Sequence, residues 1–197
     1  MTIYYTSDLH IYHDNLIKSK FRDFKSSQDC AITMLNNINR VVKEDDILYI
    51  LGDITMINKE RKSLAEGFLK SLNTKRIIIL KGNHDEAKVL DEWKDKGIIQ
   101  NWYYTTELRD IAFHCEVPVF LSHYPVIDYH SGNNCTICLH GHSHGKLKRQ
   151  LYDLYDVGVD CNNFKPVTLE QILEQKAGWH GNPYSGYIEE LRKRNEV

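Results

Sequence analysis

The chain has 197 residues, of which 25 are basic and 27 acidic, so its formal net charge is −2. This balance lacks the broad basic surface of proteins that grip long nucleic acids, and it favours a small or locally held substrate. No apolar run approaches the roughly 18 residues of a membrane span, and the opening MTIYYTSDLH is unlike a secretory signal. The five cysteines are too few for a disulfide scaffold, which predicts reduced thiols and a cytoplasmic location.

Five apolar runs bounded by turn residues predict strands, and each run ends in side chains that can bind a metal. In chain order the runs are IYYTSDLH, DILYILGD, RIIILKGNHD, VPVFLSHYP and TICLHGHSH. Two helices are expected between the first three runs. The first, within residues 26–42, has a helical apolar stripe and a capping box at Ser26 and Asp29, and the second covers about residues 60–72.

The alternation of strands and helices predicts a parallel sheet covered on both faces, with ligands at the carboxyl ends of its strands. From about residue 99 to 123 helical periodicity is replaced by β-prone stretches, which indicates added antiparallel strands and a mixed architecture. A last helix is expected after Thr168, with Gln171 completing its capping box. We interpret residues 1–177 as one catalytic domain and residues 178–197 as a C-terminal extension.

The strand ends supply seven candidate metal ligands: Asp8, His10, Asp53, Asn83, His123, His142 and His144. Seven donors exceed the needs of one ion, but they suit two ions about 3.5–4 Å apart that share a carboxylate. Asp53 is the expected bridge, because it follows a strand that should be central. Mixed imidazole, carboxylate and amide donors favour Mn, with Fe, Zn and Co as alternatives. The CxxC pair Cys135 and Cys138 has no second pair, and we interpret both as small residues of a buried strand.

The ordered motifs DLH, GD, GNHD, SH and GHSH resemble the signature of the calcineurin-like metallophosphoesterase family over residues 3 to about 173. The resemblance implies an α/β fold in which a double β-sheet sandwich of mixed sheets is flanked by helices. It places one metal on Asp8, His10, Asp53 and His144, and the second on Asp53, Asn83, His123 and His142. It also implies that His84 is the catalytic imidazole, with Asp85 beside it to orient or polarise the ring.

This site predicts a phosphodiesterase acting on a small nucleotide or a nucleic-acid end. A metal-bridging hydroxide would attack phosphorus in line, and His84 would protonate the leaving oxygen as general acid. The same motifs also suit a phosphomonoesterase, a nucleotide pyrophosphatase or a protein phosphatase. A non-enzymatic metal-binding scaffold is the remaining alternative, and the intact motifs argue against it.

Four further residues lie near these motifs in the sequence, and two of them have two interpretations each. His13 either contacts the substrate or begins a helix, and Arg22 either reaches a substrate phosphate or is an exposed loop arginine. Tyr124, beside His123, is expected to line the substrate pocket. His140 precedes the histidine loop and is expected to pack or form a hydrogen bond within it.

Overall fold

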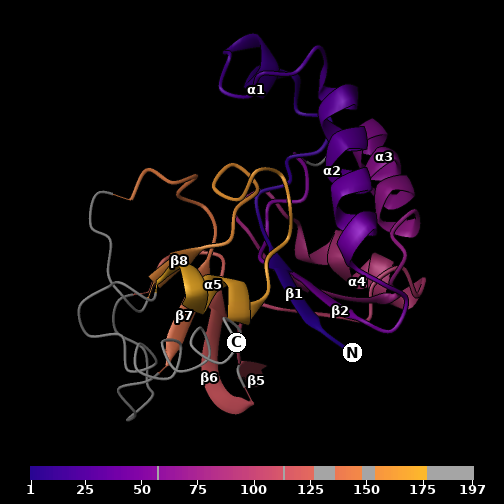
Figure 1. Cartoon of the computed structure of the whole chain (residues 1–197). Coiled ribbons are helices and arrows are strands. Elements are labelled where there is room, and N and C mark those ends of the chain that lie inside the picture. The colour runs from indigo at the N-terminus through magenta and orange to yellow at the C-terminus, as the bar shows by residue number, and fades with distance from the viewer. Residues whose placement is uncertain (57, 113, 127–135, 148–153, 177–197) are drawn as a thin grey trace.

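The computed structural model describes residues 1–56, 58–112, 114–126, 136–147 and 154–176. Two four-stranded sheets form its centre, as predicted for the double sandwich (Figure 1). The first sheet is parallel throughout and contains β1 (Ile3–Thr6), β2 (Ile47–Ile50), β3 (Arg76–Leu80) and β4 (Asn101–Tyr103) in that order. The second sheet contains β5 (Thr105–Ala112), β6 (Cys115–Ser122), β7 (Ile137–His140) and β8 (Leu154–Asp156). It is mixed, because β5 runs antiparallel to β6 while the other pairs are parallel.

Five helices accompany the sheets in the described part of the chain: α1 (Asp14–Lys18), α2 (Ser27–Val41), α3 (Lys59–Lys70), α4 (Ala87–Asp95) and α5 (Leu169–Gln175). Helices α2, α3 and α4 gather on one side of the first sheet, and the second sheet lies on the other side (Figure 1). The cap at Thr168 is confirmed, and the one at Ser26 is confirmed in part. Thr168 and Gln171 form both bonds of a capping box, whereas at Ser26 the structure has one of the two, from the backbone N–H of Asp29 to the Ser26 side chain at 3.0 Å.

Side chains alternate between the two faces of the first sheet, and this divides the hydrophobic core into two clusters. In β2, Leu48 and Ile50 pack beneath the helices, whereas Tyr49, and Leu51 just after the strand, pack with residues of the second sheet. Successive side chains of a strand point to opposite faces, so a strand buried on both faces must be apolar almost throughout. The uninterrupted apolar runs seen in the sequence are the consequence of this double burial.

One expectation about strand direction was wrong. We expected residues 99–123 to add antiparallel strands, and β5 and β6 do so, but β4 extends the first sheet in parallel. The reason is α4, which the sequence analysis did not assign and which provides a third crossover between parallel strands. Its buried residues Val89, Leu90 and Trp93 have the i, i+1, i+4 spacing that indicates a helix.

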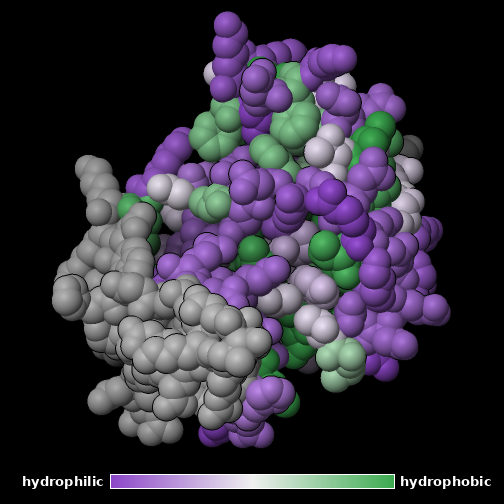
Figure 2. Space-filling model, in the orientation of Figure 1, coloured by the Kyte–Doolittle hydropathy of each residue, from purple (hydrophilic) through white to green (hydrophobic). Residues whose placement is uncertain are grey.

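The surface is mainly hydrophilic on the face shown in Figure 2, where the described hydrophobic residues form small groups separated by polar ones. Among the described residues, no helix combines the length and the apolar character needed to cross a membrane.

Candidate metal centre

The predicted ligand loops meet where the carboxyl ends of strands from both sheets come together. Two backbone bonds join the loops after β1 and β2, from Asp8 N–H to Gly52 O and from His10 N–H to Asp53 O, both at 3.0 Å. The second sheet is attached through the backbone N–H of His142, which lies 3.0 Å from both carboxylate oxygens of Asp8. Residues more than 130 positions apart are thereby held in one site.

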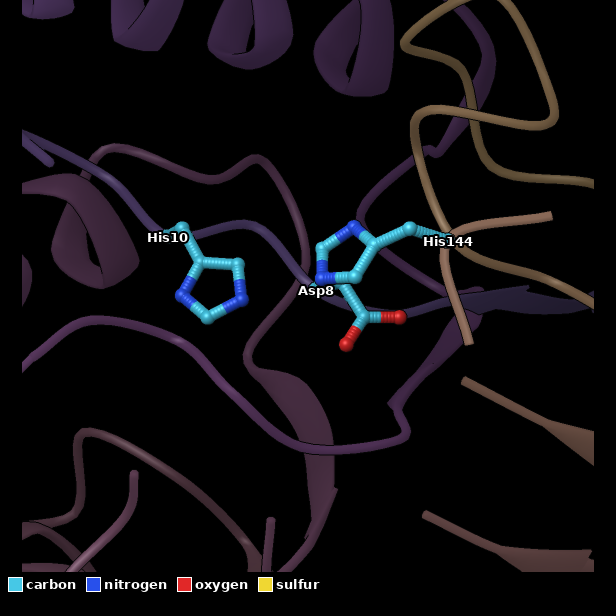
Figure 3. A group of neighbouring side chains, drawn as sticks. All are labelled: Asp8, His10 and His144. Carbon is cyan, nitrogen blue, oxygen red and sulfur yellow. The ribbon is translucent and has the colours of Figure 1, made fainter. Parts of the chain in front are cut away.

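Asp8, His10 and His144 form the first group of donors. One donor atom from each lies within 4.8 Å of the other two. Figure 3 shows the His144 imidazole beside the Asp8 carboxylate, with the His10 ring next to them. The rings of His10 and His144 are stacked, with centroids 5.3 Å apart. These are three of the four residues expected to hold one metal.

Asn83, His123 and His142 form the second group. The Asn83 side-chain oxygen lies 2.9 Å from His123 Nε2 and 2.9 Å from His142 Nδ1. Two imidazole nitrogens and one amide oxygen therefore converge, as expected of donors to a single ion. Asn83 and His142 are exposed, whereas Asp8 and His10 are buried, so this second group is the more open to solvent.

Asp53 lies between the two groups. Its Oδ2 is 3.6 Å from His10 Nε2 and 3.6 Å from His123 Nε2, so one oxygen faces a histidine of each group. Donor atoms of Asp53 and His123 also lie within 4.8 Å of Asp8. This position between both sets of donors fits a carboxylate that bridges two ions.

The loops that carry the donors have an unusual backbone. Five of the seven predicted ligands have positive φ angles, although none is glycine: Asp8, His10, Asp53, His142 and His144, with values from 43° to 66°. Left-handed conformations cost non-glycine residues roughly 1–2 kcal/mol each and persist where the surrounding structure imposes them, often at functional sites. Close packing also requires glycine at position 141, since a Cβ there would lie 1.9 Å from Ser7 Oγ and 2.5 Å from Asp8 Oδ2.

The electrostatics of the site suit divalent cations. Asp8 is fully buried and Asp53 is 2% exposed, and Asp53 pairs with the histidines His10, His84 and His123. Burial raises the pKa of Asp8, and burial followed by the nearby Arg22 charge lowers the pKa of His10 to about 2. His10 is therefore a neutral imidazole, the form that binds metals, and the buried carboxylates favour a bound cation. The residues present thus fit the metal ions expected from the sequence.

His84 and Asp85 follow Asn83 but have different surroundings. The His84 side chain is 36% exposed, and its Nε2 lies 3.9 Å from Asp53 Oδ2. Asp85 is 4% exposed, and its carboxylate accepts backbone N–H bonds from Gly82, Asp53 and Ile54 at 2.8–3.1 Å. This corrects the expectation that Asp85 orients or polarises the His84 ring. Asp85 instead ties the loop after β3 to the loop after β2, because backbone amides occupy its oxygens.

Arg22 also departs from both of its sequence interpretations. It is 2% exposed, so it is not an exposed loop arginine. Its guanidinium bonds to both carboxylate oxygens of Asp160 and to the backbone carbonyls of Asp8 and Leu9, at 2.7–2.8 Å. The guanidinium is committed to protein partners, which corrects the expectation that it reaches a substrate phosphate.

The remaining three residues lie near the site. His13 is the N-cap residue of α1, and its ring is 5.6 Å from that of His10. Tyr124 is 47% exposed, and its ring centroid lies 4.8 Å from that of His142 and 5.0 Å from that of His123, which suits a pocket-lining residue. His140 is buried, and its Nδ1 lies 2.9 Å from the backbone carbonyl oxygen of Gly141, within the loop as expected.

Sequence reasoning missed two aspartates that hold the histidine loop. Asp160 Oδ2 lies 2.7 Å from His144 Nδ1. Asp156 accepts hydrogen bonds from the Ser143 hydroxyl at 2.7 Å and the Gly145 N–H at 2.9 Å. The signal was present in YDVGVD, another apolar run bounded by acidic residues. Cys138 is buried in β7, as expected, whereas Cys135 and the extension from residue 178 lie outside the described residues.

Comparisons with known proteins agree with this site. The family model of calcineurin-like phosphoesterases matches residues 1–194, so the chain belongs to this family. Together with the donor groups, this membership defines a metal-dependent phosphoesterase.

Two relatives and one solved structure are similar over most of the chain. An uncharacterised protein of Methanocaldococcus jannaschii is 30% identical over 178 residues, which cover 87% of this chain and 89% of that protein. The gene 66 protein of Mycobacterium phage L5 is 26% identical over 80% of this chain and 86% of its own length. The crystal structure of a protein of unknown function from Aquifex aeolicus has a TM-score of 0.64 and 26% identity, covering 87% of this chain and 97% of that one.

Proposed function

We propose that this protein is a phosphodiesterase that uses two divalent metal ions, with Mn as the favoured metal and Fe, Zn and Co as alternatives. The position of Asp53 Oδ2 between His10 and His123, 3.6 Å from each Nε2, is the observation that carries the dinuclear proposal. When bound, such ions supply an activated water for attack on phosphorus and stabilise charge on the phosphoryl oxygens. We expect Asp8, His10, Asp53 and His144 to hold one ion, and Asp53, Asn83, His123 and His142 to hold the other.

His84 is the proposed general acid. It is more exposed than the neighbouring His10 and His123, yet its Nε2 remains 3.9 Å from the Asp53 carboxylate. The backbone N–H of His84 donates to Asp53 Oδ1 at 2.9 Å, which fixes the residue beside the site while its ring stays accessible. An imidazole in this position can protonate a leaving oxygen, a contribution typically worth about 10²–10⁴ in rate.

The environment of the site favours a diester over a monoester. A phosphomonoester carries nearly two negative charges at neutral pH, whereas a diester carries one and has a substituent on each side of phosphorus. Arg22, the guanidinium nearest the DLH loop, is committed to Asp160 and to backbone carbonyls. Exposed aromatic rings lie next to both donor groups, Phe21 at 5.5 Å from His144 and Tyr124 at 4.8 Å from His142. This arrangement suits a singly charged phosphate with two flanking groups, such as a small nucleotide diester.

Paired model substrates test the proposal. Protein freed of metal with a chelator is supplied with Mn²⁺, and the hydrolysis of bis-p-nitrophenyl phosphate is compared with that of p-nitrophenyl phosphate. We expect Mn²⁺ to restore turnover, with the diester preferred. Hydrolysis of the monoester alone would instead support a phosphomonoesterase, a pyrophosphatase or a protein phosphatase, and parallel titrations with Zn²⁺, Co²⁺ and Fe²⁺ test the choice of metal.

His84→Ala tests the assigned role of the imidazole. We expect turnover to fall about 10²–10⁴-fold while the amount of bound Mn²⁺ stays unchanged. If the variant lost its bound metal, His84 would be a ligand and the assignment would be wrong. A cytoplasmic location stays a prediction, as does the absence of a broad nucleic-acid-binding surface.

A further inference from the structure

A hydrogen-bonded chain connects the buried Arg22 with the partly buried Asp160 and His144. Asp160 Oδ1 accepts from Arg22 Nε at 2.7 Å, while Oδ2 lies 2.8 Å from Arg22 Nη2 and 2.7 Å from His144 Nδ1. The Arg22 side chain is 1% exposed and that of Asp160 is 10% exposed. The bidentate pairing gives the carboxylate a defined orientation, and the low exposure limits competition from water.

The same arginine holds the loop that carries two other ligands of the first metal. Arg22 Nη2 donates to the carbonyl of Asp8 and Nη1 donates to the carbonyl of Leu9, both at 2.7 Å. The backbone φ angles of Asp8, His10 and His144 are all positive. These strained loops need external contacts to keep their conformation. One guanidinium supplies such contacts to the DLH loop directly and to the GHSH loop through Asp160.

The partner of Nδ1 also decides which nitrogen of His144 can bind a metal. With Nδ1–H donated to Asp160, Nε2 is the nitrogen left with a free lone pair. A carboxylate behind a ligating histidine orients the ring and increases its basicity. Among the four predicted histidine ligands, His144 alone has a carboxylate at its second nitrogen. His123 Nδ1 faces the Leu51 carbonyl, and His10 Nδ1 is buried without a partner. His142 turns its Nδ1 toward Asn83 within the second donor group, and the ion pairs of the described residues include none between His142 and a carboxylate.

We propose that Asp160 and Arg22 are positioning residues of the first metal site, which hold His144 with Nε2 toward the ion and fix the DLH loop against it. The inference deepens the proposed function, since it concerns one half of the proposed two-metal centre. It predicts that the two halves differ. Loss of Asp160 weakens the half built on Asp8, His10 and His144, and leaves the half built on Asn83, His123 and His142.

Calorimetric titration of the metal-free full chain with Mn²⁺ tests this asymmetry without any substrate, so the result does not depend on the diesterase proposal. We expect Asp160→Ala to weaken one binding step about 10–100-fold, the usual effect of removing such a partner, and to leave the other step unchanged. Asp160→Asn keeps the shape and an acceptor oxygen but loses the charge, so its effect should be smaller. Asp110→Asn is the control, because Asp110 is also a buried aspartate but bonds to Tyr5, away from the site.

A second measurement reads the imidazole directly. In protein loaded with diamagnetic Zn²⁺, ¹⁵N-labelled histidine should give a downfield Nδ1–H proton for His144, and this signal should disappear in Asp160→Ala. Unchanged affinity at both steps in folded Asp160→Ala and Asp160→Asn would overturn the proposal. Equal weakening of both steps would also overturn it, since that pattern indicates general loosening of the structure. If Asp160→Ala does not fold, the same criteria apply to Asp160→Asn.

Discussion

Gly82→Ala is expected to disrupt the metal centre through a single methyl group. A Cβ at position 82 would lie 2.2 Å from Asp53 Oδ1 and 2.5 Å from the Asp53 backbone nitrogen. Ordinary van der Waals contact begins near 3.4 Å, so the carboxylate oxygen must retreat by about 1.2 Å. Asp53 is 2% exposed and has little room for that movement. A displacement of about 1 Å at a reacting centre can cost about 100-fold in rate, equivalent to roughly 2.7 kcal/mol.

The assay is Mn²⁺ affinity by calorimetry, followed by Mn²⁺-dependent turnover of bis-p-nitrophenyl phosphate. Gly67→Ala is the matched control, because a Cβ at this position in α3 meets nothing within 4 Å. The control should retain metal affinity and gain about 0.5–1 kcal/mol of stability from the better helix former. A folded Gly82→Ala protein with wild-type metal affinity and turnover would refute the packing argument and the bridging role assigned to Asp53.

Three further predictions concern the core, the pH dependence and the pocket. Leu69→Ala should lower the free energy of unfolding by about 2–5 kcal/mol in urea denaturation, since Leu69 is fully buried, whereas Leu64→Ala on the same helix should cost far less because Leu64 is 37% exposed. Burial raises the pKa of Asp110 above 3.8, so the folded protein holds the Asp110 proton more tightly than the unfolded chain does. This tighter binding stabilises the folded state. The stabilisation is complete below about pH 3.8 and is lost as pH rises through the folded pKa. Asp110→Asn keeps an acceptor for the Tyr5 hydroxyl and removes this titration, so the melting temperature of the variant relative to wild type should rise with pH in metal-free protein, and a constant difference would contradict the assignment. Tyr124→Leu should raise KM for bis-p-nitrophenyl phosphate without changing Mn²⁺ affinity, and Tyr124→Phe should restore KM if the ring makes the contact; an unchanged KM in the leucine variant would exclude Tyr124 from the pocket.

The donors of the site were predictable because their signals are local. Asp8, Asp53 and His142 each lie within three residues of the end of an apolar run, and parallel strands bring their carboxyl ends to one edge of a sheet. The caps at Ser26 and Thr168 were predictable for the same reason, since each depends on a residue three positions away.

The roles of Arg22 and Asp85 were not predictable in this way. Arg22 resembles a surface arginine in the sequence, and its burial depends on Asp160, 138 residues further along. Asp85 adjoins His84 in the chain, but its carboxylate bonds to backbone amides of a loop about 30 residues earlier. In each case the neighbours in sequence are not the neighbours in space that set the role of the side chain.

The sequence by itself determined the family, the five strands that carry the motifs and the set of candidate metal donors, because short-range periodicity and motif spacing carry that information. Only the tertiary structure decided that β4 is parallel, that Asp85 joins two loops, and that Arg22 and Asp160 support His144. The physical reason is that a buried polar group must find its partner wherever folding brings one within about 3 Å, and this distance does not depend on separation along the chain.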